Sequence, residues 1–368
     1  MAKTPQQLIR ENVLALNAYH VPEAGDVLKL DAMENPWPWP GALQQQWFDE
    51  LAGVEANRYP DPSAKQLRAA LRGWMGLDSL SNADDIEIML GNGSDELIQI
   101  LAMAVAGDGA KRPVLMAPEP GFVMYKMIST YVDIGYIGVQ LDDQFELDLP
   151  GMLDALKTHQ PAIIFLAYPN NPTGNSWNRQ SIEAIIEAAP GLVVADEAYA
   201  PFAADSMVSG LEKYPNLLVM RTLSKVGLAG LRLGMLAGSK QWIEQLNKLR
   251  MPYNVNVLTQ RSAIFALKNQ QVLDAQAEEL RKSREALAAS LALIKDVTVW
   301  PSQANFILLK MAPNTAKPIH DSLCRQGVLI KNLNGSHPAL VDCLRVTVGT
   351  REQNKQFLSA LNNAMAAF

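Results

Sequence analysis

Between residues 60 and 240, short apolar runs alternate with helical patterns, and this alternation constrains the fold more than any other feature. The runs are IEIML, RPVLMA, PAIIFLAY, GLVVA and NLLVM. Each lacks a polar face, which is typical of strands covered on both sides. Strands that alternate with helices favour an α/β fold with a mainly parallel sheet flanked by helices.

The pattern changes near residue 245. Residues 242–295 are mostly helical in pattern, and residues 297–368 contain the short strand-like runs ANFILLK, GVLIKN and CLRVTVG before a last helix. We therefore expect three parts: an arm packing with the small domain (1–35), a large domain (36–245) and a smaller α/β C-terminal domain (246–368).

Composition narrows the class of partner. The formal net charge is −6 and there is no basic run, which argues against nucleic acid. The two cysteines, Cys324 and Cys343, match no metal or redox spacing, so we expect no metal site and a reducing, cytoplasmic setting. No signal peptide is apparent, and no apolar stretch approaches the roughly 20 residues of a membrane helix.

Lys225 lies in RTLSKVGLAGLRLG, just after the apolar run NLLVM. The carboxyl end of a strand is where open α/β sheets place their ligands. The neighbours offer hydroxyl donors, glycines that allow close backbone approach and a planar cation that suits phosphate: Thr222, Ser224, Gly227, Gly230 and Arg232. This pattern indicates a lysine that reacts with a ligand carrying a phosphate.

Two more strand ends carry polar side chains. Asp196 follows GLVVA, with Tyr199 three residues later, and a buried carboxylate there is costly unless it is paired. Asn171 lies in the turn AYPNNPTGN, where Asn171–Pro172 is a candidate cis peptide bond. The alternatives are a capping aspartate and an ordinary turn.

The loop GNGSDE, between a strand and a helix, offers backbone N–H groups and a helix N-terminus to a phosphate at Ser94 and Asp95. The alternative is an ordinary N-cap at Ser94. A dinucleotide fingerprint requires a third glycine where Glu96 stands, and no P-loop motif is present. Together with an aspartate that can hold a pyridinium nitrogen and a lysine that can bond an aldehyde, the cradle indicates pyridoxal phosphate chemistry.

These motifs also carry a resemblance that spans nearly the whole chain. RYPDPSAKQLR, GNGSDELI, PNNPTG, VVADEAY, TLSKVGLAGLRLG, ANFIL and LRVTVGT occur in this order. The chain resembles the fold-type I, class II pyridoxal phosphate aminotransferases, and most closely the histidinol-phosphate aminotransferases. The resemblance implies a mainly parallel seven-stranded sheet in the large domain. It also implies amino-group transfer between L-glutamate and imidazole acetol phosphate, giving L-histidinol phosphate and 2-oxoglutarate in L-histidine biosynthesis.

Other activities share most of these motifs. The alternatives are an aromatic amino-acid aminotransferase, a decarboxylase of a phosphorylated amino acid, and a cofactor-binding regulatory domain without turnover. The last class usually carries a DNA-binding module, and no basic helix-turn-helix pattern precedes the motifs here.

The resemblance assigns roles to eleven residues around pyridoxal 5′-phosphate. Lys225 would bond the cofactor, Asp196 would pair with its ring nitrogen, and Phe122 would stack on its ring. Tyr199 and Asn171 would bond its phenolic oxygen. Its phosphate would be held by Ser94, Asp95, Thr222, Ser224 and Arg232, and by Tyr59 of the neighbouring subunit of a homodimer.

The substrate would be held by Arg345, which binds its anionic group, and by Lys331, Tyr19 and Asn35. Three features depart from the family pattern. Lys331 stands where many relatives have a second phosphate-binding arginine, and Met33 replaces a frequent asparagine. The segment from Lys225 to Arg232 is one residue shorter than in some relatives.

Overall fold

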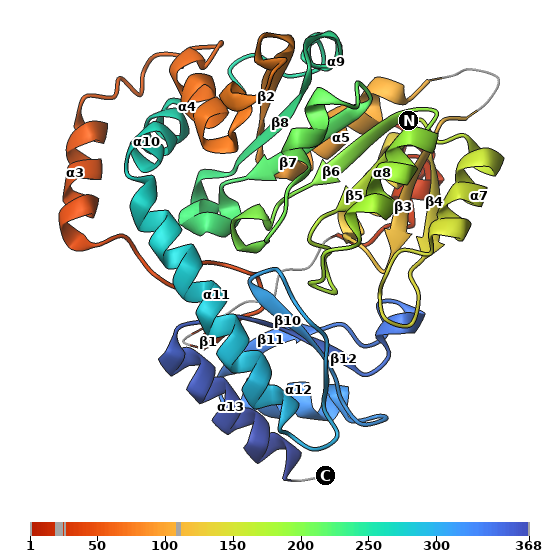
Figure 1. Cartoon of the computed structure of the whole chain (residues 1–368), viewed down its shortest axis with the longest axis vertical. Coiled ribbons are helices and arrows are strands. Elements are labelled where there is room, and N and C mark those ends of the chain that lie inside the picture. Colours follow the sequence, from red (N-terminus) through yellow and green to blue (C-terminus); the bar gives the residue numbers. More distant parts are fainter. Residues whose placement is uncertain (1, 19–24, 26, 108–111, 367–368) are drawn as a thin grey trace.

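The computed structural model of the chain describes residues 2–18, 25, 27–107 and 112–366, arranged around two β-sheets (Figure 1). The large sheet has seven strands in the order β2-β8-β7-β6-β5-β3-β4. Their bounds are β2 (Ile86–Asn92), β3 (Val114–Glu119), β4 (Gly135–Gln140), β5 (Ile163–Ala167), β6 (Leu192–Asp196), β7 (Leu217–Thr222) and β8 (Leu233–Ser239). Among these strands, β8 alone runs in the direction opposite to the other six. The expected mainly parallel seven-stranded sheet is confirmed.

The large sheet is buried on both faces, as its apolar runs predict. In β5, Ile164 and Leu166 belong to one hydrophobic core, and Ile163 and Phe165 to another. Successive strand residues point to opposite faces, so a strand between two cores needs a continuous apolar run.

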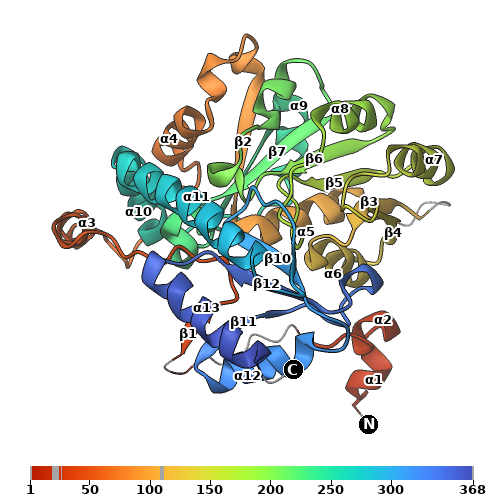
Figure 2. The same ribbon diagram turned by 60° about the horizontal axis from the view of Figure 1, so that its bottom comes forward.

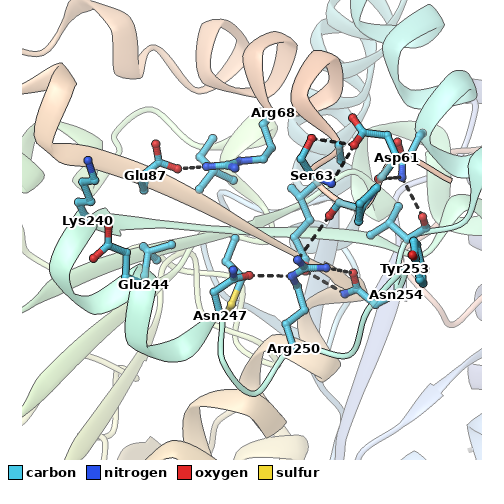
Figure 3. A pocket seen from close by; sticks show the side chains of 18 residues that line it. Asp61, Ser63, Arg68, Glu87, Lys240, Glu244, Asn247, Arg250, Tyr253 and Asn254 are labelled. Atoms are coloured by element: carbon cyan, nitrogen blue, oxygen red, sulfur yellow. Dashed lines mark hydrogen bonds and ion pairs between the residues drawn. The ribbon is translucent and has the colours of Figure 1, made fainter.

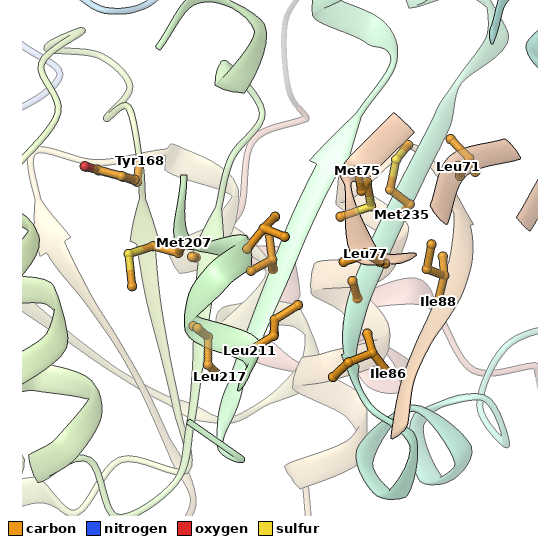
Figure 4. Packing of buried hydrophobic residues seen from close by; sticks show 14 of the residues in the cluster. Leu71, Met75, Leu77, Ile86, Ile88, Tyr168, Met207, Leu211, Leu217 and Met235 are labelled. Carbon is orange, nitrogen blue, oxygen red and sulfur yellow. The ribbon is translucent and has the colours of Figure 1, made fainter. Parts of the chain in front are cut away.

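Helices cover both faces of the large sheet. On one face lie α4 (Lys65–Met75), α7 (Leu149–His159), α8 (Arg179–Ala188) and α10 (Val257–Lys268). On the other lie α5 (Gly93–Val105), α6 (Val123–Val132) and α9 (Lys240–Leu246). Figure 4 shows the first core, where Leu71 and Met75 of α4 approach Ile88 of β2 and Met235 of β8.

The smaller sheet has five strands in the order β1-β11-β12-β10-β9. Their bounds are β1 (Leu28–Leu30), β9 (Thr298–Val299), β10 (Phe306–Lys310), β11 (Val328–Asn332) and β12 (Cys343–Thr347). Three helices pack on this sheet: α11 (Gln270–Ala292), α12 (Ala316–Arg325) and α13 (Arg351–Met365) (Figure 2). This smaller α/β unit lies below the carboxyl ends of the large sheet's parallel strands in Figure 1.

The two cores meet along α11. Leu273, in its first turn, belongs to the core of the large sheet, and Ala277 belongs to the core of the small one. The helix α10 precedes this point and lies wholly in the first core, against α3 (Gly41–Ala52) and α4. The boundary near residue 245 stays a prediction, and this packing favours a division inside α11.

The N-terminal segment contacts both units. β1 pairs in parallel with β11, and Leu30 and Met33 are buried in the small core. Ahead of it, α1 (Pro5–Leu8) is followed by α2 (Glu11–Leu14), and the Asn12 side chain donates to the carbonyl of Thr130 in α6 (2.8 Å). None of the described helices has the length and apolar character needed to cross a membrane.

Candidate active site

A cavity of about 110 Å³ lies at the carboxyl edge of the large sheet, and we call it the lysine cavity. The strands β2, β5, β6 and β7 all end at this edge, because β2 and β7 are both antiparallel to β8 and therefore run the same way. Ten of the predicted site residues line it: Ser94, Asp95, Phe122, Asn171, Asp196, Tyr199, Thr222, Ser224, Lys225 and Arg232. Strand ends far apart in sequence thus come together as expected.

Asp196, at the end of β6, is a buried carboxylate with two protein partners. The Tyr125 hydroxyl donates to its Oδ2 (2.6 Å), and the backbone N–H of Ala198 donates to its Oδ1 (3.2 Å). Burial raises the pKa of Asp196 to about 6, although both hydrogen bonds favour the charged form. A cation placed against this carboxylate would favour the charged form further.

Lys225 lies shortly after β7, and its side chain is half-buried. Its Nζ donates to the carbonyl of Ala32 (3.3 Å) and lies 5.8 Å from the centroid of the Tyr199 ring. Burial lowers the pKa of Lys225 to about 8, and the positive charge of Arg345 adds to this effect. A neutral amine, the form that attacks aldehydes, is therefore accessible near physiological pH.

The two segments predicted to cradle a phosphate, GNGSDE and RTLSK, lie together at the lysine cavity, and we call them the cradle. Arg232 reaches Asp95 (Nη2 to Oδ2, 3.2 Å), and Thr222 donates to the Ser224 hydroxyl (2.9 Å). Two glycines keep it open: a Cβ at Gly93 would lie 2.7 Å from Arg232 Nη2, and one at Gly234 would lie 2.5 Å from the Gly93 carbonyl carbon. The contact at Gly234 is with backbone, which cannot give way, and Gly93 has φ +78°, which other residues rarely adopt.

The glycines after Lys225 differ from each other. Gly227 has φ +116°, which side chains rarely adopt, whereas a Cβ at Gly230 would meet nothing within 4 Å. The sequence suggested close backbone approach at both positions, and the structure requires glycine only at Gly227.

Asn171 connects the lysine cavity with a neighbouring cavity of about 340 Å³, which we call the cation cavity. Arg345 and Lys331 line the cation cavity, and they are direct partners across β11 and β12. The Arg345 guanidinium donates to Asn171 Oδ1 and to the carbonyl of Asp31 (3.2 Å). Two cations side by side form a site for an anion. The cis peptide bond expected at Asn171–Pro172 is confirmed.

Two predicted residues lie outside both cavities. The Asn35 amide donates to the carbonyl of Val226 (3.2 Å) and to Gln276 Oε1 (2.9 Å), so it fixes the chain next to Lys225. Tyr59 is 81% exposed and stacks on Tyr253, with 4.5 Å between ring centroids. Tyr19, also predicted, lies outside the described residues.

Sequence reasoning missed Tyr125, which stacks on Phe165 (4.6 Å between centroids) and holds Asp196. A tyrosine on the buried face of an otherwise apolar helical stretch was its only signal. Met33 was noted only as a departure, yet it lines both cavities with φ +55°, a conformation that asparagine adopts more readily.

A third cavity of about 340 Å³ lies on another side of β2, between α4 and α9 (Figure 3). Two of its arginines have partners within the cavity: Arg68 pairs with Glu87, and Arg250 donates to Asn247 (2.7 Å) and Asn254 (2.8 Å). Asn254 also donates to Glu96 Oε2 (2.9 Å), next to the phosphate cradle. Through Asn254, this hydrogen-bond network contacts the start of α5, where the cradle lies.

Comparisons with known proteins agree with this geometry. Residues 26–361 match the model of the family described as aminotransferase class I and II. Histidinol-phosphate aminotransferase 2 of Nitrosococcus oceani is 50% identical, covering 96% of each chain. Histidinol-phosphate aminotransferase of Chromobacterium violaceum is also 50% identical, covering 98% of this chain and 99% of the relative.

Among solved structures, histidinol-phosphate aminotransferase from Sinorhizobium meliloti in complex with pyridoxal-5′-phosphate has the same fold. Its TM-score is 0.84 at 22% identity, covering 98% of each chain. The match in fold, the extent of the family model and the relatives at half identity all agree. The chain belongs to the aminotransferase class I and II family and, within it, to the histidinol-phosphate aminotransferases.

Proposed function

We propose that the protein is a pyridoxal phosphate-dependent transaminase that moves the amino group between L-glutamate and imidazole acetol phosphate. The products are L-histidinol phosphate and 2-oxoglutarate, in L-histidine biosynthesis. The observation that carries the proposal is the juxtaposition of Lys225 and Asp196 in one cavity with the Lys331–Arg345 pair in the next. The names and identities of the relatives support the same activity.

The lysine cavity fits the cofactor on its own chemistry. The open cradle of Gly93 and Gly234, with Arg232 beside it, suits a phosphate, and Asp196 suits a protonated ring nitrogen. Lys225 would bond the aldehyde, Phe122 would cover the ring, and Tyr199 and Asn171 would face the phenolic oxygen. Bound there, pyridoxal phosphate supplies an electron sink for negative charge at the substrate carbon.

The chain's own residues supply binding and proton transfer. Once the substrate amine displaces Lys225 from the aldehyde carbon, its Nζ would take the proton from the substrate carbon and deliver it to that former aldehyde carbon. A pKa of about 8 suits an amine that both accepts and donates this proton. Asp196 would keep its charge with a cation facing it, and would thereby hold the ring nitrogen in its protonated form. Arg345 and Lys331 bind the substrate phosphate in one half-reaction and a glutamate carboxylate in the other.

We further propose that the protein forms a homodimer and acts in the cytoplasm. Tyr59 does not line its own lysine cavity and is exposed, which supports a role in the cradle of a second copy. Cys324 and Cys343 are free thiols, in keeping with a reducing compartment.

The test is a set of half-reactions on the purified holoenzyme. Histidinol phosphate, glutamate, phenylalanine and threonine phosphate are added separately, and the absorbance of the cofactor is followed as it takes up the amino group. We expect fast conversion by histidinol phosphate and glutamate and slow conversion by phenylalanine. Fast phenylalanine with inert histidinol phosphate would move the protein to the aromatic aminotransferases, and carbon dioxide release from threonine phosphate to the decarboxylases.

A second experiment tests whether the protein recognises the phosphate of its substrate. A site built to bind a polar substrate group rejects the analogue that lacks it by roughly 10⁴-fold or more. Histidinol should therefore have a far lower kcat/KM than histidinol phosphate. Comparable values for the two would contradict phosphate recognition by Arg345 and Lys331.

A further inference from the structure

The cation cavity contains one carboxylate that anion binding does not explain. Its basic lining residues are Lys126, Lys331, His337 and Arg345, and Glu119 is the single acidic residue among the described residues that line it. We propose that Glu119 accepts the N–H of the substrate's imidazole ring and thereby selects this substrate over aromatic amino acids. The proposal rests on the proposed function and names a specificity determinant for it.

Neighbouring strands make room for this carboxylate. Glu119 ends β3, and its side chain lies over Gly138 of β4, where a Cβ would come within 2.3 Å of Glu119 Cδ and 2.5 Å of its Oε2. Any side chain at position 138 would displace the carboxylate. The Tyr136 hydroxyl, two residues earlier in β4, hydrogen-bonds Glu119, and burial followed by the charge of Glu119 raises the Tyr136 pKa well above its usual value.

The remaining neighbours of the carboxylate hold it loosely. Gln140 Nε2 is 3.5 Å from Oε2, Lys126 Nζ is 3.8 Å from Oε1, and His337 Nε2 is 3.8 Å from Oε2. Good hydrogen bonds of these types span roughly 2.7–3.2 Å. A carboxylate offers about four lone-pair positions, so acceptor capacity is left for a ligand N–H.

His337 presents a ring nitrogen to the same carboxylate, but at 3.8 Å it lies beyond hydrogen-bond distance. The backbone N–H of Ala339 donates to His337 Nδ1 (3.2 Å), which leaves Nε2 as the protonated nitrogen of the neutral ring. Burial lowers the pKa of His337, and this effect favours that neutral form. His337 therefore does not neutralise the charge of Glu119, which remains available to a weakly basic ring.

The surroundings of Glu119 suit a flat heterocycle. Phe122, Pro120, Leu333 and Leu340 contribute apolar surface to the same cavity, and Lys331 and Arg345 line it as well. A ligand with a phosphate on one limb and an imidazole on the other matches both kinds of group. A phenyl ring in the same place would take water away from Glu119 without offering it a donor in exchange.

The experiment compares wild type, Glu119→Gln and the matched control Glu187→Gln, which removes an exposed charge on α8. Half-reactions are measured with histidinol phosphate, glutamate, phenylalanine and 2-aminopropyl phosphate, which keeps the phosphate but lacks the imidazole. In Glu119→Gln, kcat/KM for histidinol phosphate should fall by about 10- to 100-fold, mainly through KM, because a hydrogen bond to a charged group is lost. The values for glutamate and 2-aminopropyl phosphate should stay within about threefold, and that for phenylalanine should rise.

Several outcomes would overturn the inference. An equal loss on all four substrates would make Glu119 a structural residue, and no loss on histidinol phosphate would remove it from recognition. If wild type itself does not use histidinol phosphate, the proposed function fails and the inference fails with it. Glu119→Asp is the second variant; it keeps the charge but shortens the reach, and it should show the same substrate-selective loss if Glu119→Gln folds poorly.

Discussion

The lysine cavity and the cation cavity differ in how the chain builds them. Polar residues at the ends of strands in one sheet make most of the lysine cavity, where Asp196 ends β6 and Lys225 lies shortly after β7. The cation cavity lies between two units: Glu119 and Tyr136 come from the large sheet, whereas Lys331 and Arg345 come from the small one. The residues proposed for the chemical step thus come mostly from one sheet, and those proposed to select the substrate come from both units.

The largest effect should come from the centre of the lysine cavity. Lys225→Ala removes the amine that holds the cofactor and moves the proton, so we expect turnover to fall by on the order of 10⁴-fold or more. Steady-state assays with histidinol phosphate and 2-oxoglutarate would measure it, with circular dichroism to verify the fold. Multiple turnover at a comparable rate would remove Lys225 from catalysis.

The next largest effect should be a loss of cofactor affinity when the cradle is narrowed. Gly234→Ala places a Cβ 2.5 Å from the Gly93 carbonyl carbon and 2.7 Å from the Ser94 nitrogen, so the cradle must shift. We expect affinity for pyridoxal phosphate to fall by about 10- to 100-fold, as when buried hydrogen bonds to a charged group are lost. Titration of cofactor-free protein, followed by absorbance, measures the affinity.

The chain supplies the control for this variant. Gly230→Ala lies a few residues away, where a Cβ meets nothing within 4 Å, and should bind the cofactor like wild type. Equal losses in both variants would show that the loop responds to any added side chain, and not to closure of the cradle.

A smaller, pH-dependent effect should follow from Tyr125→Phe. The Tyr125 hydroxyl stabilises the charged form of Asp196, so its removal should raise the pKa of that carboxyl above about 6. A protonated Asp196 cannot pair with a ring cation, so cofactor binding should weaken about three- to tenfold near pH 6. Near pH 8 Asp196 is charged in both proteins, and the difference should vanish. Cofactor titrations at pH 6, 7 and 8 test this, and a pH-independent deficit would indicate a packing role instead.

The comparison also explains what sequence could predict. Lys225, Asp196 and Asn171 each follow an apolar run that reads as a buried strand, and parallel strands end at one edge, so their meeting was predictable. The seven-stranded sheet has the same basis, together with the family resemblance. Tyr125 was missed because its partner, Asp196, lies 71 residues away and helical spacing does not indicate it.

Arg345 and Lys331 of the cation cavity were named through the resemblance, but Glu119 was not, for a physical reason. Glu119 also ends a strand, but its role depends on Gly138 of β4 and on His337, from the segment between β11 and β12. These contacts cross two cores, and no local pattern fixes how the units pack. Asn35 illustrates the same limit: the resemblance placed it in the substrate pocket, and its amide bonds Val226 and Gln276.

The smallest effect should come from Lys331→Arg, at the junction itself. Lys331 faces Arg345 across β11 and β12, and an arginine there would present a planar pair of donors to the substrate phosphate in place of one ammonium. We expect KM for histidinol phosphate to fall about two- to fivefold with kcat unchanged, because a second bidentate contact binds ground state and transition state alike. Lys310→Arg, on the exposed end of β10, is the matched control and should change neither constant. A rise in KM for Lys331→Arg would mean that the two guanidinium groups crowd each other. The lysine would then be the better fit to a cavity that already holds Arg345 and Glu119.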